Sequence, residues 1–183
     1  MTRQQENTKR DKVMRPLRQL IITLAALCAV SCAKETGADG EHVSVGETIP
    51  AFTVTTMDGA TVSAATMLGK PSVIVFFDTT CPDCQRQLPE IEAVWRELEG
   101  SINAVAIARE QGPDPVRDYW SGNGLTMPVA APGNRRTFNL FDRRSKSGVP
   151  QVFVTDKDVR VTLYGNDQKI LTTRKITDKL KNN

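Results

Sequence analysis

Cys81 and Cys84 are separated by two residues in the stretch FFDTTCPDCQRQLP, which covers residues 76–89. A buried strand is predicted before the pair and a helix after it, so the first sulfur lies at the predicted helix N-terminus. The free N–H groups and the dipole of that terminus stabilise a negative charge. The thiolate is the nucleophilic form of cysteine. The spacing therefore predicts an attacking Cys81 and, one turn into the helix, a resolving Cys84.

Two other uses of a cysteine pair fit this sequence less well. A zinc centre needs three or four ligands, and the only histidine of the chain, His42, lies in a segment expected to be a solvated tether. We therefore expect no metal. A structural disulfide stabilises mainly by closing a long loop, and a two-residue gap closes almost none. The pair is predicted to exchange disulfides through a mixed disulfide on Cys81, which Cys84 displaces.

The two residues between the cysteines suit a helix start. Pro82 falls at the first helical position, where its missing N–H costs nothing and its fixed φ helps the helix begin. Asp83 lies in the first turn, where a carboxylate favours the helix but opposes a thiolate on Cys81. Our hypothesis is that Asp83 makes the pair more reducing. The alternative is a helix-start charge without a redox effect.

The elements that must hold the pair begin with two buried strands. The runs SVIVFF (72–77) and INAVAIA (102–108) are continuously apolar, as expected of strands covered on both faces. Between them, apolar residues recur at spacings of three and four, which predicts one buried helix face that ends at Gly100. These residues are Leu88, Ile91, Trp95 and Leu98.

Shorter elements are predicted on either side of this unit. Upstream, AFTVTT (51–56) alternates as a strand and MDGA (57–60) is a turn. The downstream predictions are helices over 114–124 and 134–141, a brief strand in MPVAA, a hairpin over 149–156 and 159–165, and an amphipathic helix over 167–183. Strands and helices alternate and a hairpin ends the sheet. This pattern predicts an α/β fold whose central mixed β-sheet is flanked by helices.

Charge and hydropathy set the N-terminus apart. Residues 1–31 hold six of the 24 basic residues and two of the 21 acidic ones, so the rest of the chain has a net charge of −1. That part has no electrostatic footprint for nucleic acid. The apolar run at 20–31 is too short to span a bilayer but suits a secretory signal. Residues 33–44 are polar and predict a flexible tether, followed by a domain over 45–183.

The apolar run ends in AVSC, which resembles the lipobox of bacterial lipoproteins. In that group the cysteine becomes the lipid-carrying first residue, so the resemblance implies a signal peptide over 1–32 and lipidation at Cys32. Met14 is an alternative start of the signal. A cleaved signal without lipid and an uncleaved anchor are the alternatives to lipidation. Each exports the domain to a compartment where disulfides persist.

Residues 45–175 resemble the thioredoxin-fold domain of TlpA-like and ResA-like thiol-disulfide oxidoreductases, a group related to the redoxin and AhpC/TSA proteins. Residues 45–77 resemble an N-terminal β extension and the first core strand, and CPDC resembles the active-site pair. SGVPQVFVTDKDVRV resembles the segment with the cis-proline, which implies a cis bond between Val149 and Pro150. In the family, the backbone before that proline lines the groove beside the reactive sulfur and pairs with bound substrate.

Several positions depart from the pattern of that family. Thr80 stands where Trp usually precedes the first cysteine, so the aromatic rim of the site is missing. Gln87 takes the place of a glutamate that accepts a proton in some members, and an amide cannot take a proton from Cys84. The candidate acceptors are therefore Asp78, Asp83 or water.

The loop before the predicted cis-proline is strongly charged. It contains Asp142, Arg143, Arg144 and Lys146. These charges either bias which partners dock or simply belong to a solvated loop. We expect the solvated loop.

The resemblance implies an exported, membrane-tethered disulfide reductase on the periplasmic side of a bacterial membrane, working without a cofactor. Its implied partners are protein disulfides, with apocytochrome c as one candidate, and a membrane-embedded electron donor. A peroxiredoxin-like thiol peroxidase is an alternative, although no proline stands in 72–80 ahead of the cysteine as that signature requires. A copper-binding chaperone on the same fold is disfavoured by the scarcity of histidine.

Replacing Asp83 by Asn separates the two interpretations of this residue. If the carboxylate opposes the thiolate, the Asp83→Asn variant is more oxidising than the native chain, because its reduced form is better stabilised. The measurements are the reduction potential in glutathione and dithiothreitol buffers and the titration of the Cys81 thiol. If neither moves, Asp83 acts as a helix-start charge only.

Overall fold

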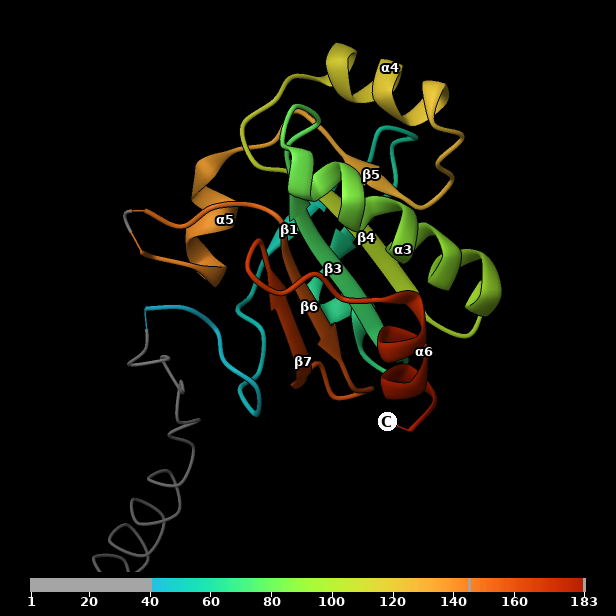
Figure 1. Cartoon of the computed structure of the whole chain (residues 1–183). Coiled ribbons are helices and arrows are strands. Elements are labelled where there is room, and N and C mark those ends of the chain that lie inside the picture. The colour runs from blue at the N-terminus through green and yellow to red at the C-terminus, as the bar shows by residue number, and fades with distance from the viewer. Residues whose placement is uncertain (1–40, 145, 183) are drawn as a thin grey trace, which may run out of the picture. The chain divides into compact units, whose positions relative to one another are not determined.

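The computed structural model describes residues 41–144 and 146–182 (Figure 1). At its centre lies a five-stranded sheet with the strand order β5-β4-β3-β6-β7. Its strands are β3 (Ser72–Phe77), β4 (Asn103–Ala108), β5 (Val129–Ala130), β6 (Gln151–Thr155) and β7 (Val161–Asn166). β3, β4 and β5 are parallel, whereas β6 and β7 join antiparallel. The predicted mixed sheet is confirmed.

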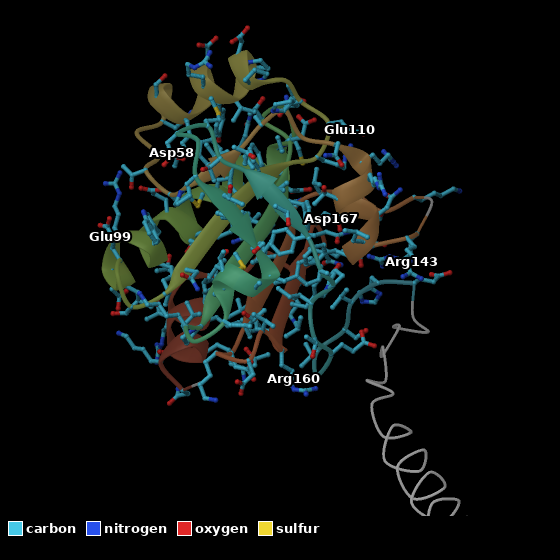
Figure 2. The ribbon with its side chains drawn as sticks, turned by 180° about the vertical axis from the view of Figure 1, so that it is seen from behind. Asp58, Glu99, Glu110, Arg143, Arg160 and Asp167 are labelled. Carbon is cyan, nitrogen blue, oxygen red and sulfur yellow. The ribbon has the colours of Figure 1, made fainter. Side chains whose placement is uncertain are left out.

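The remaining elements cover the two faces of this sheet. They are β1 (Thr53–Thr55), β2 (Thr61–Ser63), α2 (Ala64–Met67), α3 (Pro82–Leu98), α4 (Pro113–Gly122), α5 (Arg135–Phe141) and α6 (Thr173–Lys181). The crossovers β3-α3-β4 and β4-α4-β5 step across the sheet in the same direction, so right-handedness puts α3 and α4 on one face. α6 packs beside α3, and the β1-β2 hairpin lies behind the sheet (Figures 1 and 2). In the part of the chain that the structure describes, no helix combines the length and hydropathy needed to cross a bilayer.

Two neighbouring phenylalanines explain why β3 is apolar throughout. Successive strand residues point to opposite faces. Phe77 contacts Trp120 of α4, with 5.0 Å between ring centroids, whereas Phe76 contacts Phe138 and Phe141 of α5 at 5.3 and 5.0 Å. Every β3 residue is buried. The strand is therefore covered on both faces, and it carries the chain rigidly to the CPDC turn.

The closing helix is shorter than predicted. α6 begins at Thr173 instead of 167, with Thr172 as its N-cap. Leu171 just before it is fully buried. Its backbone N–H donates to Gln87 Oε1 (2.7 Å) and its carbonyl accepts from Gln87 Nε2 (2.9 Å). These bonds hold the segment extended, so the helix cannot start earlier.

The predicted tether is wrong at its C-terminal end. Val43 is buried and its N–H donates to the carbonyl of Phe141 (2.8 Å). His42 forms a β-bridge with Asp142, and its ring lies 5.3 Å from that of Tyr164. Residues 41–44 therefore belong to the folded domain. The buried side chain of Val43 and the ring contact of His42 attach this polar segment to it. The predicted signal peptide, Cys32 and residues 33–40 lie outside the described residues.

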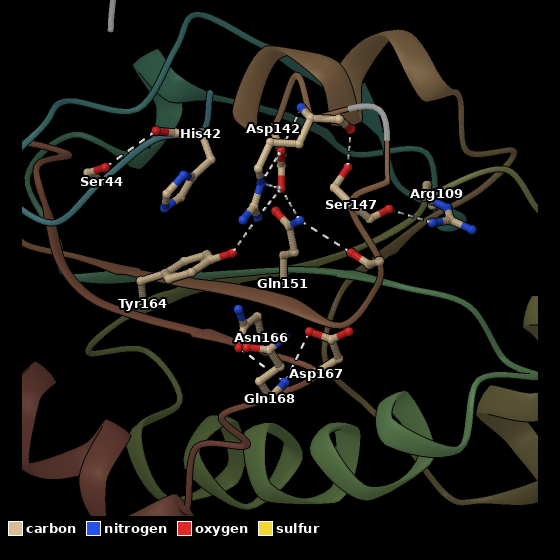
Figure 3. A network of polar contacts seen from close by, with 12 residues as sticks. His42, Ser44, Arg109, Asp142, Ser147, Gln151, Tyr164, Asn166, Asp167 and Gln168 are labelled. Carbon is tan, nitrogen blue, oxygen red and sulfur yellow. Dashed lines mark hydrogen bonds and ion pairs between the residues drawn. The ribbon is translucent and has the colours of Figure 1, made fainter. Parts of the chain in front are cut away.

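The loop before Pro150 also differs from the expected solvated loop, since Asp142 is fully buried. Its carboxylate accepts hydrogen bonds from Arg144 Nη2 (2.5 Å), Arg144 Nε (2.9 Å) and Gln151 Nε2 (Figure 3). Gln151 also donates to the carbonyl of Gly148 (3.3 Å). Burial alone would raise the pKa of Asp142, but the hydrogen bonds from Arg144 and Gln151 outweigh it and lower the pKa. This network braces both ends of the loop that carries Pro150.

We expect the Asp142→Ala variant to lose about 3 kcal/mol of its free energy of unfolding, because Arg144 and Gln151 are left without their buried acceptor. Urea unfolding at pH 7 measures this. Arg143→Ala is the matched control, since Arg143 is exposed at the periphery (Figure 2), and a change within about 0.5 kcal/mol is expected there.

The stability difference between the native chain and the Asp142→Ala variant should depend on pH. The pKa of Asp142 lies below its ordinary value of 3.8, so its contribution is present above pH 3.8 and is lost as the pH falls further. The stability difference between native chain and Asp142→Ala should shrink in that acid range. A difference that is absent at pH 7, or equal to that of Arg143→Ala, would contradict the bracing role.

Candidate active site

The two cysteines occupy different environments at the start of α3. Cys81 is the N-cap of this helix, Pro82 is its first residue, and both sulfurs are free thiols. Cys81 is half-buried, whereas Cys84 has no exposed surface. A partner can therefore reach Cys81 but not Cys84. This accessibility agrees with the predicted roles of attacking and resolving thiol.

The loop between α5 and β6 meets Cys81 at the edge of the sheet. The peptide bond between Val149 and Pro150 is cis, the geometry that the resemblance implied. The Cys81 thiol donates to the carbonyl of Val149, with 3.2 Å between Sγ and O. β3 and β6 are antiparallel neighbours with Phe76 opposite Gln151, so the end of β3 and the start of β6 lie side by side. This register brings together residues 68 positions apart in the chain.

Cys84 lies behind this contact. Its Sγ accepts a hydrogen bond from the N–H of Asp78, at 3.5 Å. Burial raises the pKa of the Cys84 thiol, as do the neighbouring Cys81 sulfur and the charge of Asp78, and together they outweigh the Asp78 N–H bond. Cys84 is therefore a thiol at neutral pH. It can attack only after a base takes its proton.

Asp78 and Asp83, the two carboxylates predicted near the pair, differ in what engages them. Asp78 Oδ1 accepts from the N–H and the hydroxyl of Thr80, at 2.8 and 2.6 Å. Asp78 is the carboxylate that acts on Cys84, because its N–H donates to Cys84 Sγ and its charge helps to raise the pKa of that thiol. Asp83 forms an ion pair with Arg86 across one helical turn. The partner cation offsets part of its charge, and its redox effect stays a prediction.

The structure gives Gln87 a task other than the predicted tuning of the sulfurs. The residue is fully buried, and both ends of its amide bond the backbone of Leu171. An amide suits this position because it pairs with both an N–H and a carbonyl. We therefore assign Gln87 to docking the segment before α6 onto α3.

Sequence reasoning missed the contacts that hold the turn before Cys81. Gln111, in the loop after β4, and Gln85, in the first turn of α3, both bond Thr79. A single glutamine in a polar loop follows no periodicity or motif, so no signal in the sequence marks it. The cis bond between Ala131 and Pro132 was missed for the same reason.

The residues described contain no group of three or more His, Cys, Asp or Glu side chains placed to hold a metal ion. Two hollows, of about 480 and 390 Å³, open beside β1 and α5, and neither includes a cysteine. The cysteine pair lies outside both hollows, at the C-terminal end of the central strand β3.

Comparison with known proteins identifies the family of this chain. Residues 45–164 match the model of the AhpC/TSA family, and the chain belongs to this family. The thiol-disulfide oxidoreductase ResA of Halalkalibacterium halodurans is 25% identical over 93 residues, which cover 50% of this chain and 53% of ResA. The chain thus spans about half the length of this relative. A putative peroxiredoxin of Mycobacterium tuberculosis is 21% identical over 133 residues, 67% of this chain and 84% of that protein.

A solved structure confirms the thioredoxin-like fold. The thioredoxin domain of a thiol-disulfide oxidoreductase from Bacteroides vulgatus superposes with a TM-score of 0.62 at 12% identity. The superposition covers 76% of this chain and 97% of that domain. At this identity the likeness concerns the fold alone.

The unequal environments of the two thiols predict selective alkylation. In the reduced, folded chain we expect iodoacetamide to modify Cys81 at least about tenfold faster than Cys84, because burial and a raised pKa both suppress the Cys84 thiolate. Peptide mass spectrometry over a time course measures both rates. The control is the urea-unfolded chain, in which the two rates should converge. Equal rates in the folded chain would contradict the assignment.

Proposed function

We propose that this chain is an exported thiol-disulfide oxidoreductase that reduces disulfides in other proteins. One observation carries the proposal: a half-buried Cys81 thiol at the N-terminus of α3, held 3.2 Å from the Val149 carbonyl, with a buried Cys84 one turn behind it. Membership of the AhpC/TSA family and the likeness to ResA support a thiol-based chemistry.

The reaction follows from the order of the two sulfurs. The Cys81 thiolate attacks one sulfur of a substrate disulfide, so a bond from Cys81 to the substrate forms and the substrate S–S bond breaks. The released substrate thiolate takes up a proton. Cys84 then loses its proton and attacks Cys81, the mixed disulfide breaks, and the second substrate thiol leaves. The substrate gains two electrons and two protons, and the Cys81-Cys84 pair becomes a disulfide.

Two groups near the sulfurs assist these steps. We propose that Asp78 Oδ2, directly or through water, accepts the Cys84 proton, because the Asp78 N–H already bonds that sulfur. The Val149 carbonyl beside Cys81 offers an acceptor to the backbone of an extended substrate once the Cys81 thiol has lost its proton. The Val149 carbonyl lies outside the strand ladder, because β6 starts only at Gln151.

The cellular setting of the proposal rests on the N-terminal sequence. We propose that the signal over 1–32 exports the chain and that lipid on Cys32 tethers it to a bacterial membrane on the periplasmic side. A dithiol protein embedded in that membrane is the proposed donor that restores the reduced pair. Apocytochrome c, whose cysteines must be reduced, is a candidate substrate among exported protein disulfides.

The first test is the reduction potential of the full chain in detergent, equilibrated with glutathione and dithiothreitol. A value of about −270 mV or lower, near that of thioredoxin, is expected for a reductase, and a value near the −120 mV of DsbA would reverse the direction. Insulin reduction should require both cysteines, and Cys84→Ser should accumulate mixed disulfides with substrate. Rapid consumption of peroxide without insulin reduction would favour the peroxidase instead.

A further inference from the structure

Thr79 lies two residues before Cys81 and is held by two glutamine side chains. Its N–H donates to Gln111 Oε1 (2.7 Å), and its hydroxyl oxygen accepts from Gln111 Nε2 (2.9 Å). Its carbonyl accepts from Gln85 Nε2 (2.8 Å). Thr79 is 7% exposed, so water has little access to these groups. All three polar groups of one loop residue are thus satisfied by side chains from other elements.

The turn that contains Thr79 contacts both sulfur-bearing residues. The N–H of Cys81 donates to the carbonyl of Asp78 (3.2 Å), and the N–H of Asp78 donates to Cys84 Sγ (3.5 Å). Thr79 lies inside this turn, directly after Asp78. A displacement of Thr79 would therefore move the donor to Cys84 and the N-cap position of Cys81 together.

Gln111 is itself fixed from behind. Its carbonyl accepts from the N–H of Gly133 (3.0 Å). A Cβ on Gly133 would lie 1.5 Å from the carbonyl oxygen of Ala108, so only glycine allows this close approach. The loop after β4 is thereby held against the loop after β5. The Gln111 amide extends from a rigid base and not from a free loop.

We propose that Gln111 is a positioning residue for disulfide exchange. By bonding Thr79 at two points, it holds the 78–81 turn so that Cys81 Sγ and Cys84 Sγ stay aligned for the second, intramolecular displacement. The inference rests on the proposed redox role of the cysteine pair. The inference concerns the alignment of the two sulfurs and not the direction of electron flow. The positioning role of Gln111 and the proposed reductase function can therefore fail separately.

The test follows oxidation of the reduced full chain by 5,5′-dithiobis(2-nitrobenzoate) in stopped flow, with Cys28→Ser and Cys32→Ser in every variant so that Cys81 and Cys84 are the only thiols. The Cys81 thiolate attacks the reagent and releases one aryl thiolate, and Cys84 then displaces the second, so two aryl thiolates appear per chain as the pair becomes a disulfide. The first step is bimolecular. The second depends on the alignment of three sulfurs, and a misplacement of 1 Å can cost about a hundredfold in such a step.

The central variant is Gln111→Met, which keeps the side-chain length but cannot bond Thr79. We expect its second release to slow by about tenfold or more, with a smaller change in the first. Gln111→Glu restores two acceptors for the Thr79 N–H and hydroxyl, so it should recover most of the second rate. Its added negative charge should also make the pair more reducing. A purely structural role would not change the ratio of the two steps.

The matched control is Asn103→Leu, at the start of β4 and so at the opposite edge of the sheet. Asn103 is also half-buried, and its amide also makes two hydrogen bonds, to Met67 O (3.1 Å) and Ser72 Oγ (3.3 Å). Its variant should lose stability in urea yet keep the second rate within about twofold. If Gln111→Met fails to fold, Thr79→Val removes only the hydroxyl bond and should give a smaller slowing of the same step.

The outcomes decide between the possibilities. An unchanged second rate in Gln111→Met, or equal slowing in Asn103→Leu, would overturn the positioning role. Slowing confined to Gln111→Met in a chain that does not reduce insulin would uphold the positioning role and reject the proposed function. A native chain that releases only one aryl thiolate would reject both.

Discussion

The antiparallel pairing of β3 with β6 is the constraint on which the site depends. With Phe76 opposite Gln151, the turn after one strand and the loop before the other end at the same edge of the sheet. A slip of one residue would reverse which side chains of β6 face α5 and which face α3. The register is secured because β3 and β6 are buried at every position. The contact between Cys81 and Val149 therefore depends on the packing of β3 and β6 inside the sheet.

Burial divides the work between two chemically identical side chains. Cys81 reaches solvent because an N-cap lies at the end of its helix, whereas Cys84 points one turn inward among core residues. The buried thiol holds its proton, since a charge there would lack solvation. A partner therefore meets one sulfur first. In the proposed reaction, the second acts only after the first has formed a mixed disulfide.

Two polar networks give precision to loops that have no regular structure. On the proline side, the buried Asp142 carboxylate ties Arg144 to Gln151. On the cysteine side, Gln111 and Gln85 hold Thr79. Buried hydrogen bonds are strong in the low local dielectric and costly to break, so such networks fix one arrangement. Each network lies beside one half of the Cys81-Val149 contact.

The sequence by itself predicted a cysteine pair at a helix start, Pro82 as the first helical residue, and a mixed sheet. These predictions follow from local rules, since alternation, spacing and fixed φ act within a few residues, whereas the cis-proline beside the pair was implied by the family resemblance. Tertiary structure alone decided that Asp142 is buried, that His42 folds onto the domain, and that Gln87 binds Leu171 instead of serving the sulfurs. Gln87 meets Leu171 across 84 positions, and His42 meets Asp142 across 100. The residue type of a polar side chain does not show whether water or a distant amide will be its hydrogen-bond partner. Only the packed fold determines that partner.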